Sequence, residues 1–173
     1  MFAVISTSLN PDSRSRIMAA VAAESIRNQS HDCQWVDLQS TLLPNCDAQE
    51  CYNDPQVHRV AQLITDSHGI LIASPIYNYD VAASAKNLIE LTGKAWTDKV
   101  VGFLCAAGGQ GSYMSVMSVA NSLMLDFHSL ILPRFVYATS ESFHGDTLVD
   151  GDVRRRIEEM SHELVRVALA LAE

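Results

Sequence analysis

Short apolar segments alternate along the whole chain with stretches that repeat apolar residues at helical spacing. The apolar segments predict five strands, at residues 2–6, 34–38, 70–74, 100–107 and 131–138. The third and fourth segments are apolar throughout, as strands buried on both faces of a parallel sheet are. The remaining stretches predict five helices, at about residues 13–28, 55–67, 81–91, 112–127 and 152–172. Asp80 is the expected N-cap of the third helix, and Gly93 can end it.

This alternation predicts an α/β fold, because each crossover between parallel strands must be right-handed and cover one face of the sheet. Five strands with no second half favour the flavodoxin-like order 2-1-3-4-5, a three-layer sandwich, over a six-stranded dinucleotide-binding fold. Pro133 lies inside the fifth segment, which suits an edge strand. Residues 1–173 show no repeat, linker or low-complexity tract, so we expect a single domain.

Charge and composition exclude several classes of function. The formal net charge is −8, and the few Lys and Arg residues form no long basic stripe, which disfavours a nonspecific nucleic-acid binder. The apolar runs are too short to span a bilayer, and the first residues lack the basic region of a signal peptide. We therefore expect a soluble, cytoplasmic protein. The four cysteines form no CxxC pair and the histidines lack zinc-site spacing, so no metal site is expected.

In sheets of this kind ligands bind beyond the carboxyl ends of the strands, so the loops there decide the function. The first such loop, "STSLNPDSRSR" at residues 6–16, leads into a helix, whose N-terminus attracts anions through unpaired N–H groups. The side chains that could add donors to a phosphate site are Ser8, Asn10, Ser13, Arg14 and Ser15. The loop has no glycine, so it is neither a P-loop nor a GxGxxG fingerprint. An ordinary turn and N-cap use the same residue types, and that interpretation stays open.

The second loop, "SPIYNYD", follows the third predicted strand. It places bulky groups at the mouth of a buried strand, and these would suit an apolar, planar ligand: Pro75, Ile76, Tyr77, Asn78 and Tyr79. The alternative is that the tyrosines only cover the core or pack against another subunit. The third loop, "AAGGQGSYMS", contains Gly108, Gly109 and Gln110 and would let the backbone approach a ligand closely. Its alternative role is a flexible turn.

Over nearly its whole length the chain resembles the NADPH-dependent FMN reductase family, which includes azo, quinone and chromate reductases. The first loop is similar to the family's Gly-Ser-x-Arg-x-x-Ser pattern, with Thr7 in the glycine place and Asn10 in the arginine place. The more specific match is the family's Pro-x-Tyr-Asn-Tyr pattern at residues 75–79, followed by the expected helix with Lys86 and Asn87.

The resemblance implies that FMN is the cofactor. Its phosphate would be held by Ser8, Asn10, Ser13, Arg14 and Ser15, and its isoalloxazine ring would border residues 75–79. Gly108, Gly109 and Gln110 would form the third flavin contact. Thr7 and Asn10 depart from the pattern, and Ile76 stands where many relatives carry Glu. These departures predict weaker FMN binding than is typical of the family, with FMN acting as a dissociable substrate.

The function implied is transfer of hydride from NADPH or NADH to FMN and on to a small acceptor such as a quinone, azo compound, free flavin or metal oxyanion. The flavin performs this chemistry, so no catalytic side chain is assigned. The alternative is a flavodoxin-type electron carrier or a flavin-binding regulatory protein that does not oxidise NAD(P)H itself. The acidic charge suits a carrier, whereas the loop at residues 75–79 favours the reductase.

The predicted helix at 112–127 has two apolar stripes, one of them formed by Val116, Val119 and Leu123. A helix that is apolar on two sides is expected to pack against more than its own sheet. In the family, dimers form through the third and fourth helices. The resemblance therefore implies a homodimer, or a tetramer, built through residues 81–92 and 112–127.

Overall fold

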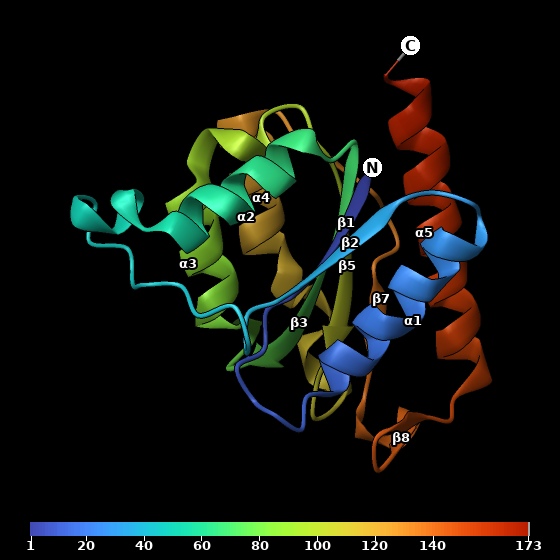
Figure 1. Cartoon of the computed structure of the whole chain (residues 1–173). Helices are drawn as coiled ribbons and strands as arrows, with labels where there is room; N and C mark the ends of the chain where they lie inside the picture. Colours follow the sequence, from blue (N-terminus) through green and yellow to red (C-terminus); the bar gives the residue numbers. More distant parts are fainter. Residues whose placement is uncertain (173) are drawn as a thin grey trace.

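A parallel sheet runs through the middle of the molecule in the computed structural model, which describes residues 1–172 (Figure 1). Its strands are β1 (Phe2–Ser6), β2 (Cys33–Asp37), β3 (Gly69–Tyr77), β4 (Asp80–Val81), β5 (Val100–Ala106), β6 (Leu130–Ile131) and β7 (Val136–Ala138). The order is β2-β1-β3-β5, with β6 and β7 both beside β5. Every pairing is parallel except that of β4 with β3. The predicted fold class and strand order are confirmed.

The strand count of this sheet differs from the prediction at two places. The segment at residues 131–138 is split, because β6 ends at Ile131 and β7 begins at Val136. Pro133, which has no N–H to donate, and Arg134, whose φ is 60°, lie in the interruption. The second difference is β4, a short antiparallel strand that follows β3 directly.

Helices cover both faces of the sheet (Figure 1). The first layer holds α1 (Arg14–Asn28) and α5 (Gly151–Ala170), and the second holds α2 (Pro55–Asp66), α3 (Ala83–Thr92) and α4 (Met117–Phe127). Short 3₁₀ helices lie at η1 (Glu50–Asn53), η2 (Gly93–Trp96), η3 (Gln110–Val116) and η4 (Ser140–Ser142), and a small hairpin pairs β8 (Phe143–His144) with β9 (Thr147–Leu148). Each helical layer encloses its own apolar core against the sheet.

The helix starts show why some boundaries were predictable. Ser13, Asp54 and Asp150 cap α1, α2 and α5 through their side chains, and α1 and α2 begin within one residue of the predicted starts at 13 and 55. The prediction for Asp80 was wrong: Ala82 is the N-cap of α3, and the Asp80 carboxylate instead accepts hydrogen bonds from Val81 N and Ser118 Oγ. The reason is that the chain first forms β4 before it enters α3.

The predicted fourth helix also begins later than expected. Residues 110–116 form η3, in which Ser112 has a non-helical backbone conformation, and α4 starts only at Met117. The tighter 3₁₀ geometry is common where a chain enters an α-helix.

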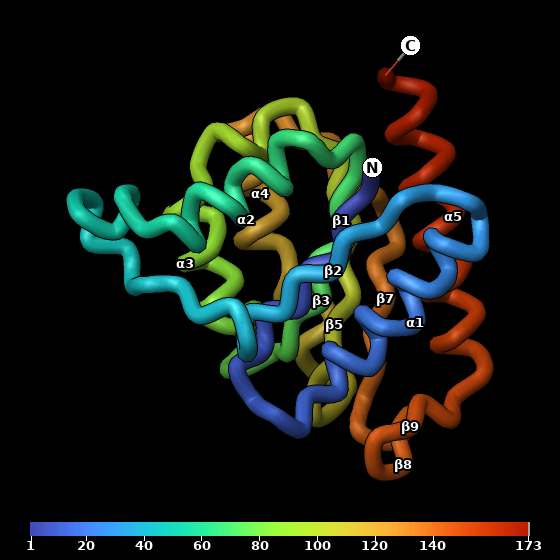
Figure 2. Tube along the Cα trace, viewed as in Figure 1, coloured from blue at the N-terminus to red at the C-terminus, as the bar shows by residue number. Residues whose placement is uncertain are grey.

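The carboxyl ends of β1, β3 and β5 bring three loops to one edge of the sheet, at the bottom of the view in Figure 2. The β8–β9 hairpin lies at the same edge, near the start of α1 (Figure 2). The connection from β2 to α2 extends outward on the side of α2 and α3 before it returns (Figure 2). The fold thus gathers the loops where this class of sheet binds ligands.

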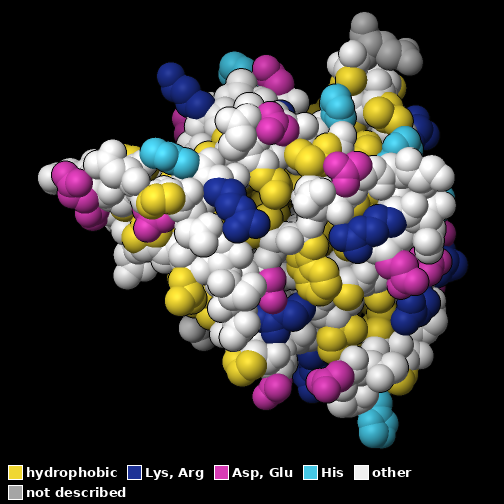
Figure 3. All heavy atoms as spheres, in the orientation of Figure 1, with side chains coloured by type: hydrophobic (Ala, Val, Ile, Leu, Met, Phe, Trp, Pro, Cys, Tyr) yellow, Lys and Arg dark blue, Asp and Glu magenta, His cyan; other side chains and the backbone are white. Residues whose placement is uncertain are grey.

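The surface carries charges of both signs. On the face shown in Figure 3, Lys and Arg side chains are interspersed with acidic and uncharged ones. Among the residues described, none of the helices is both long and apolar enough to cross a bilayer. Within the same residues, no group of three or more His, Cys, Asp or Glu side chains is arranged to hold a metal ion.

Candidate functional site

A cavity of about 400 Å³ lies at the carboxyl ends of β1, β3 and β5. It lies where the connections of neighbouring strands diverge, the position at which doubly wound sheets bind ligands. Its lining comes from all three loops: Ser8, Asn10, Asp12, Ser13, Arg14 and Ser15 from the first, Pro75, Ile76 and Tyr77 from the second, and Ala106, Ala107 and Gly108 from the third.

The start of α1 supplies hydrogen-bond donors to this cavity. Ser13 has an extended backbone, and its Oγ accepts a hydrogen bond from Arg16 N at 3.3 Å. The hydroxyls of Ser13 and Ser15 are buried and lie 2.9 Å apart, within hydrogen-bond distance. The first N–H groups of a helix have no partner within it and carry partial positive charge. The arrangement therefore suits an anion.

The loop before α1 is shaped by its own side chains. Ser8 Oγ accepts from Asn10 N at 3.2 Å, and Asn10 Oδ1 accepts from Asp12 N at 3.0 Å. The Asn10 side chain therefore supports the turn as well as lining the cavity. The Arg14 guanidinium lies 5.8 Å from the centre of the Phe143 ring, in the β8–β9 hairpin. Because Asp12 also lines the cavity, its formal charge cancels that of Arg14.

An ion pair beneath this loop was missed by the sequence analysis. Arg16 Nε lies 2.6 Å from Asp37 Oδ2, and Arg16 Nη2 lies 3.3 Å from Asp37 Oδ1. The same guanidinium donates to the backbone carbonyls of Asn10 at 3.0 Å and Pro11 at 2.7 Å, with Ser8 O at 3.5 Å. A signal existed, because an Asp at the end of a strand beside β1 is placed next to the loop that follows β1.

The second loop is a tight hairpin. β3 continues to Tyr77, three residues beyond the predicted strand, and pairs back through Tyr77 and Asp80. Asn78 and Tyr79 form the turn with φ values of 51° and 67°. Two consecutive residues with positive φ are typical of the turn that matches strand twist, and such a conformation is uncommon for a bulky aromatic residue. The turn holds Tyr77 at the rim of the cavity, where it is 53% exposed.

The third loop is tied to β7 and to the residues after it. Tyr137 Oη donates to Gly109 O at 2.6 Å, and Ser140 Oγ donates to Gly108 O at 3.4 Å. Added Cβ atoms at Gly108 and Gly109 would meet nothing within 4 Å, so the backbone is open on that side. A ligand could therefore lie close to the main chain here.

The structure thus brings together most, though not all, of the residues predicted to bind a cofactor. Those lining the cavity are Ser8, Asn10, Ser13, Arg14, Ser15, Pro75, Ile76, Tyr77 and Gly108. Asn78 lines a neighbouring cavity, and Tyr79, Gly109 and Gln110 line neither. Tyr79 is 56% exposed.

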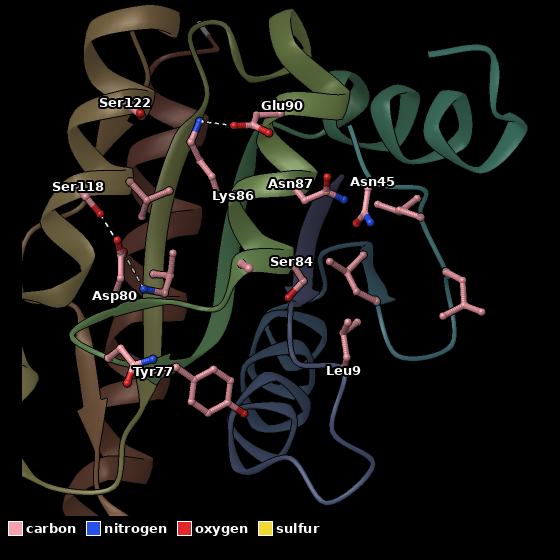
Figure 4. Close-up of a pocket in the computed structure, with 17 residues that line it drawn as sticks. Leu9, Asn45, Tyr77, Asp80, Ser84, Lys86, Asn87, Glu90, Ser118 and Ser122 are labelled. Atoms are coloured by element: carbon pink, nitrogen blue, oxygen red, sulfur yellow. Dashed lines mark hydrogen bonds and ion pairs between the residues drawn. The ribbon is translucent and has the colours of Figure 1, made fainter. Parts of the chain in front are cut away.

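The neighbouring cavity, of about 830 Å³, is drawn in Figure 4. Tyr77 lines both cavities. Its apolar lining consists of Leu9, Leu38, Leu42, Leu43, Val81, Ala83 and Val119. Its polar lining consists of Asn45, Asn78, Asp80, Ser84, Lys86, Asn87, Glu90, Ser118 and Ser122. This cavity is not predictable from the sequence, because the connection at residues 39–54 has no clear periodicity.

One wall of this second cavity is held by α3. Asn87 Oδ1 accepts from Cys46 N at 2.8 Å, and Asn87 Nδ2 donates to Pro44 O at 2.9 Å. Lys86 and Glu90, in the upper part of the view in Figure 4, form an ion pair at 3.1 Å. The cavity therefore has an apolar side formed by residues 42–43 and a charge-compensated side formed by α3.

Residues 1–144 match the sequence model of a family described as NADPH-dependent FMN reductase. The chain belongs to this family. The reductase is 28% identical over 144 residues to the NAD(P)H-dependent FAD/FMN reductase of Geobacillus thermodenitrificans (strain NG80-2), covering 81% of this chain and 77% of that protein. It is 28% identical over 166 residues to the probable NADPH:quinone oxidoreductase 1 of Oryza sativa subsp. japonica, covering 90% and 83%.

The reductase also has the fold of solved flavoenzymes. It superposes with a TM-score of 0.79 and 18% identity on FerB, the flavoenzyme NAD(P)H:(acceptor) oxidoreductase of Paracoccus denitrificans, covering 98% of this chain and 97% of that one. The donors at the start of α1 fit a phosphate, and Pro75, Ile76 and Tyr77 offer an apolar border to a flat ring. The residues present therefore fit FMN.

Proposed function

We propose that the protein is an NAD(P)H-dependent FMN reductase that binds FMN in the 400 Å³ cavity. The observation that carries this proposal is the meeting of the three loops there, with hydroxyl and N–H donors at one end and Pro75, Ile76 and Tyr77 beside them. The family match supports the same cofactor.

Each loop has a separate task in this proposal. Ser8, Ser13, Ser15 and the first N–H groups of α1 bind the phosphate, and Arg14 adds a charge-assisted contact. Pro75, Ile76 and Tyr77 would border the isoalloxazine ring, and the backbone at Gly108 would bond its polar edge. All of these groups orient and hold the cofactor.

FMN held by the first loop and by Pro75, Ile76 and Tyr77 would supply the redox chemistry between a reduced nicotinamide and the acceptor. The chain then needs no general acid or base of its own. The turn at Asn78 and Tyr79 positions Tyr77, which would hold the ring beside the carboxyl ends of the strands.

We propose that the second substrate, the reduced nicotinamide or the acceptor, enters through the 830 Å³ cavity. Its shared wall at Tyr77 gives it access to the ring, and its volume lies in the range of small-molecule sites. The relatives named for quinone reduction support a quinone-type acceptor. Leu42 and Leu43 suit an apolar molecule of this kind.

We also propose a homodimer through α3 and α4. Val116, Val119 and Leu123 are buried within the subunit, so they do not form the outer stripe. That stripe is formed by methionines on η3 and α4 that are 38–49% exposed: Met114, Met117 and Met124. Sedimentation equilibrium tests this part, and a mass of one chain at working concentrations would contradict it.

The experiment that tests the function is stopped-flow mixing of the FMN-loaded protein with NADPH and with NADH under anaerobic conditions. We expect prompt bleaching of the flavin absorbance, and reoxidation when a quinone is added. A protein that stays yellow would be an electron carrier, the alternative that its acidic charge of −8 suits. A protein whose spectrum shows no bound flavin even with excess FMN would contradict both functions.

A further inference from the structure

Backbone carbonyl groups of the loop before α1 converge on one guanidinium. We propose that Arg16 is a positioning residue for phosphate binding: it draws these carbonyls to its side of the loop, so that the cavity side presents donors. Asp37 in turn holds Arg16. The inference rests on the proposed function, because it concerns the phosphate of FMN.

The hydrogen bonds of Arg16 determine which backbone atoms are engaged. The carbonyl oxygens of Asn10 and Pro11 accept from Nη1 at 3.0 and 2.7 Å, and Ser8 O lies 3.5 Å from Nη2. Each oxygen is the negative end of a peptide dipole and would repel a phosphate if it faced the cavity. Arg16 does not itself line the cavity, whereas Ser8, Asn10 and Asp12 do. It therefore acts through the loop.

The charges at the cavity explain why the orientation of these carbonyl groups affects phosphate binding. Arg14 and Asp12 both line it, and their formal charges cancel. Attraction for a phosphate must then come from the N–H groups at the start of α1 and from the serine hydroxyls. It requires that backbone carbonyl groups do not face the cavity and repel the anion. Arg16 holds those carbonyl groups on its own side of the loop, and its charge is balanced by that of Asp37.

Asp37 fixes the guanidinium in this position. It stands at the end of β2, beside β1, and pairs with Arg16 through two N–O contacts of 2.6 and 3.3 Å. The side chains are only 18% and 20% exposed, so the pair is largely shielded from water. The planar guanidinium group of arginine can bond the carboxylate and the loop carbonyls simultaneously, whereas the single ammonium group of a lysine could not.

The test compares FMN with riboflavin, which has the same ring but no phosphate. Dissociation constants are measured by flavin fluorescence titration for the wild type, Arg16→Met and Arg16→Lys. We expect Arg16→Met to raise the dissociation constant for FMN about tenfold, with riboflavin changed less than about twofold. Arg16→Lys should recover part of the loss, because it keeps the charge and loses the fork.

Arg27→Lys is the matched control. Arg27 lies on the same helix and donates to one backbone carbonyl, Cys33 O, at 2.9 Å. Its replacement should leave both dissociation constants unchanged. If Arg16→Met does not fold, Asp37→Asn provides the second variant, because it keeps the shape of the side chain while removing its charge. It should weaken FMN binding and spare riboflavin.

Two results would overturn the inference. One is an unchanged dissociation constant for FMN in Arg16→Met and Asp37→Asn. The other is an equal loss for FMN and riboflavin, as expected if the ion pair only stabilises the packing of α1 against β2. Failure of the proposed function looks different, because the wild type itself would then bind no FMN.

Discussion

The two cavities that meet at Tyr77 are built in different ways. The loop beside the smaller one, residues 8–13, is held by a nearly buried ion pair, by three carbonyl contacts to Arg16, and by its own side-chain turns. The outer wall of the larger one, residues 42–46, is held to α3 by the two hydrogen bonds of Asn87. Leu42 in that wall is 74% exposed.

The difference reflects what each cavity is proposed to bind. Recognition of an anion requires donors at fixed positions, because hydrogen bonds are directional and a misplaced carbonyl repels the charge. Apolar contact is non-directional and scales with buried area, so a wall of leucines can meet flat molecules of several shapes. We therefore expect substitutions in the first loop to change cofactor affinity, and substitutions at the second wall to change use of the acceptor.

The largest effect is expected when Ser13 and Arg14 are both replaced by Ala. Loss of one charge-assisted contact costs about 1.5 to 3 kcal/mol, which is roughly a ten- to hundredfold increase in the dissociation constant for FMN. Fluorescence titration measures it, with Arg59→Ala on the exposed side of α2 as the control. An unchanged constant would remove the phosphate assignment. The KM for a quinone, measured with saturating FMN, should stay the same.

Asn87→Leu is expected to have the next largest effect, and on the other cavity. It removes both hydrogen bonds to Pro44 and Cys46, each contributing about 1 kcal/mol, so the KM for a quinone should rise by up to about thirtyfold. The dissociation constant for FMN should not change. Asn53→Ala is a matched control, because the Asn53 amide bonds only Glu50, at 3.2 Å on the surface. An unchanged quinone KM in Asn87→Leu would show that this wall does not take part in acceptor binding.

Tyr77→Ala should affect both cavities, since Tyr77 is the wall that they share. An aromatic pair contributes about 0.5 to 1.5 kcal/mol, so we expect a roughly two- to tenfold loss in FMN affinity and a rise of the same size in quinone KM. Tyr77→Phe should change both much less, because the ring remains. A change in FMN affinity alone, or in quinone KM alone, would show that the two cavities are independent.

The smallest effect is expected from labelling Cys46 with a thiol reagent at pH 8. Burial raises the pKa of Cys105 to about 12 and that of Cys33 to about 11, so these thiols stay protonated and unreactive. Cys46 is partly exposed, and its backbone N–H is bonded by Asn87. Its label should raise quinone KM roughly twofold by weakening that bond, without changing FMN affinity. Cys46→Ser should abolish the response.

Much of the fold was predictable because its signals are local. β1 and β5 are continuous apolar segments and fall at the predicted positions, within one residue. α1 and α2 begin after residues that cap them, Ser13 and Asp54. The interruption at Pro133 and the strand β4 were missed, because each depends on how the chain pairs with a neighbouring strand.

The candidate site was predictable in the same uneven way. The loop residues around Ser13 and Tyr77 were found from their place after a strand. Arg16 was not, since its partner Asp37 lies 21 residues further along the chain. The second cavity was missed for the same reason: Asn87 reaches Pro44 over a separation of 43 residues.

The sequence by itself determined the alternation of strands and helices, their order in the sheet, and the meeting of three loops at one edge. These depend on apolar periodicity and short turn signals, which act over a few residues. Only the tertiary structure decided that Arg16 lies behind the first loop, that Tyr77 divides two cavities, and that Asn87 holds the second wall. Such pairings require side chains from distant segments to come within about 3 Å of each other, and packing alone brings them there.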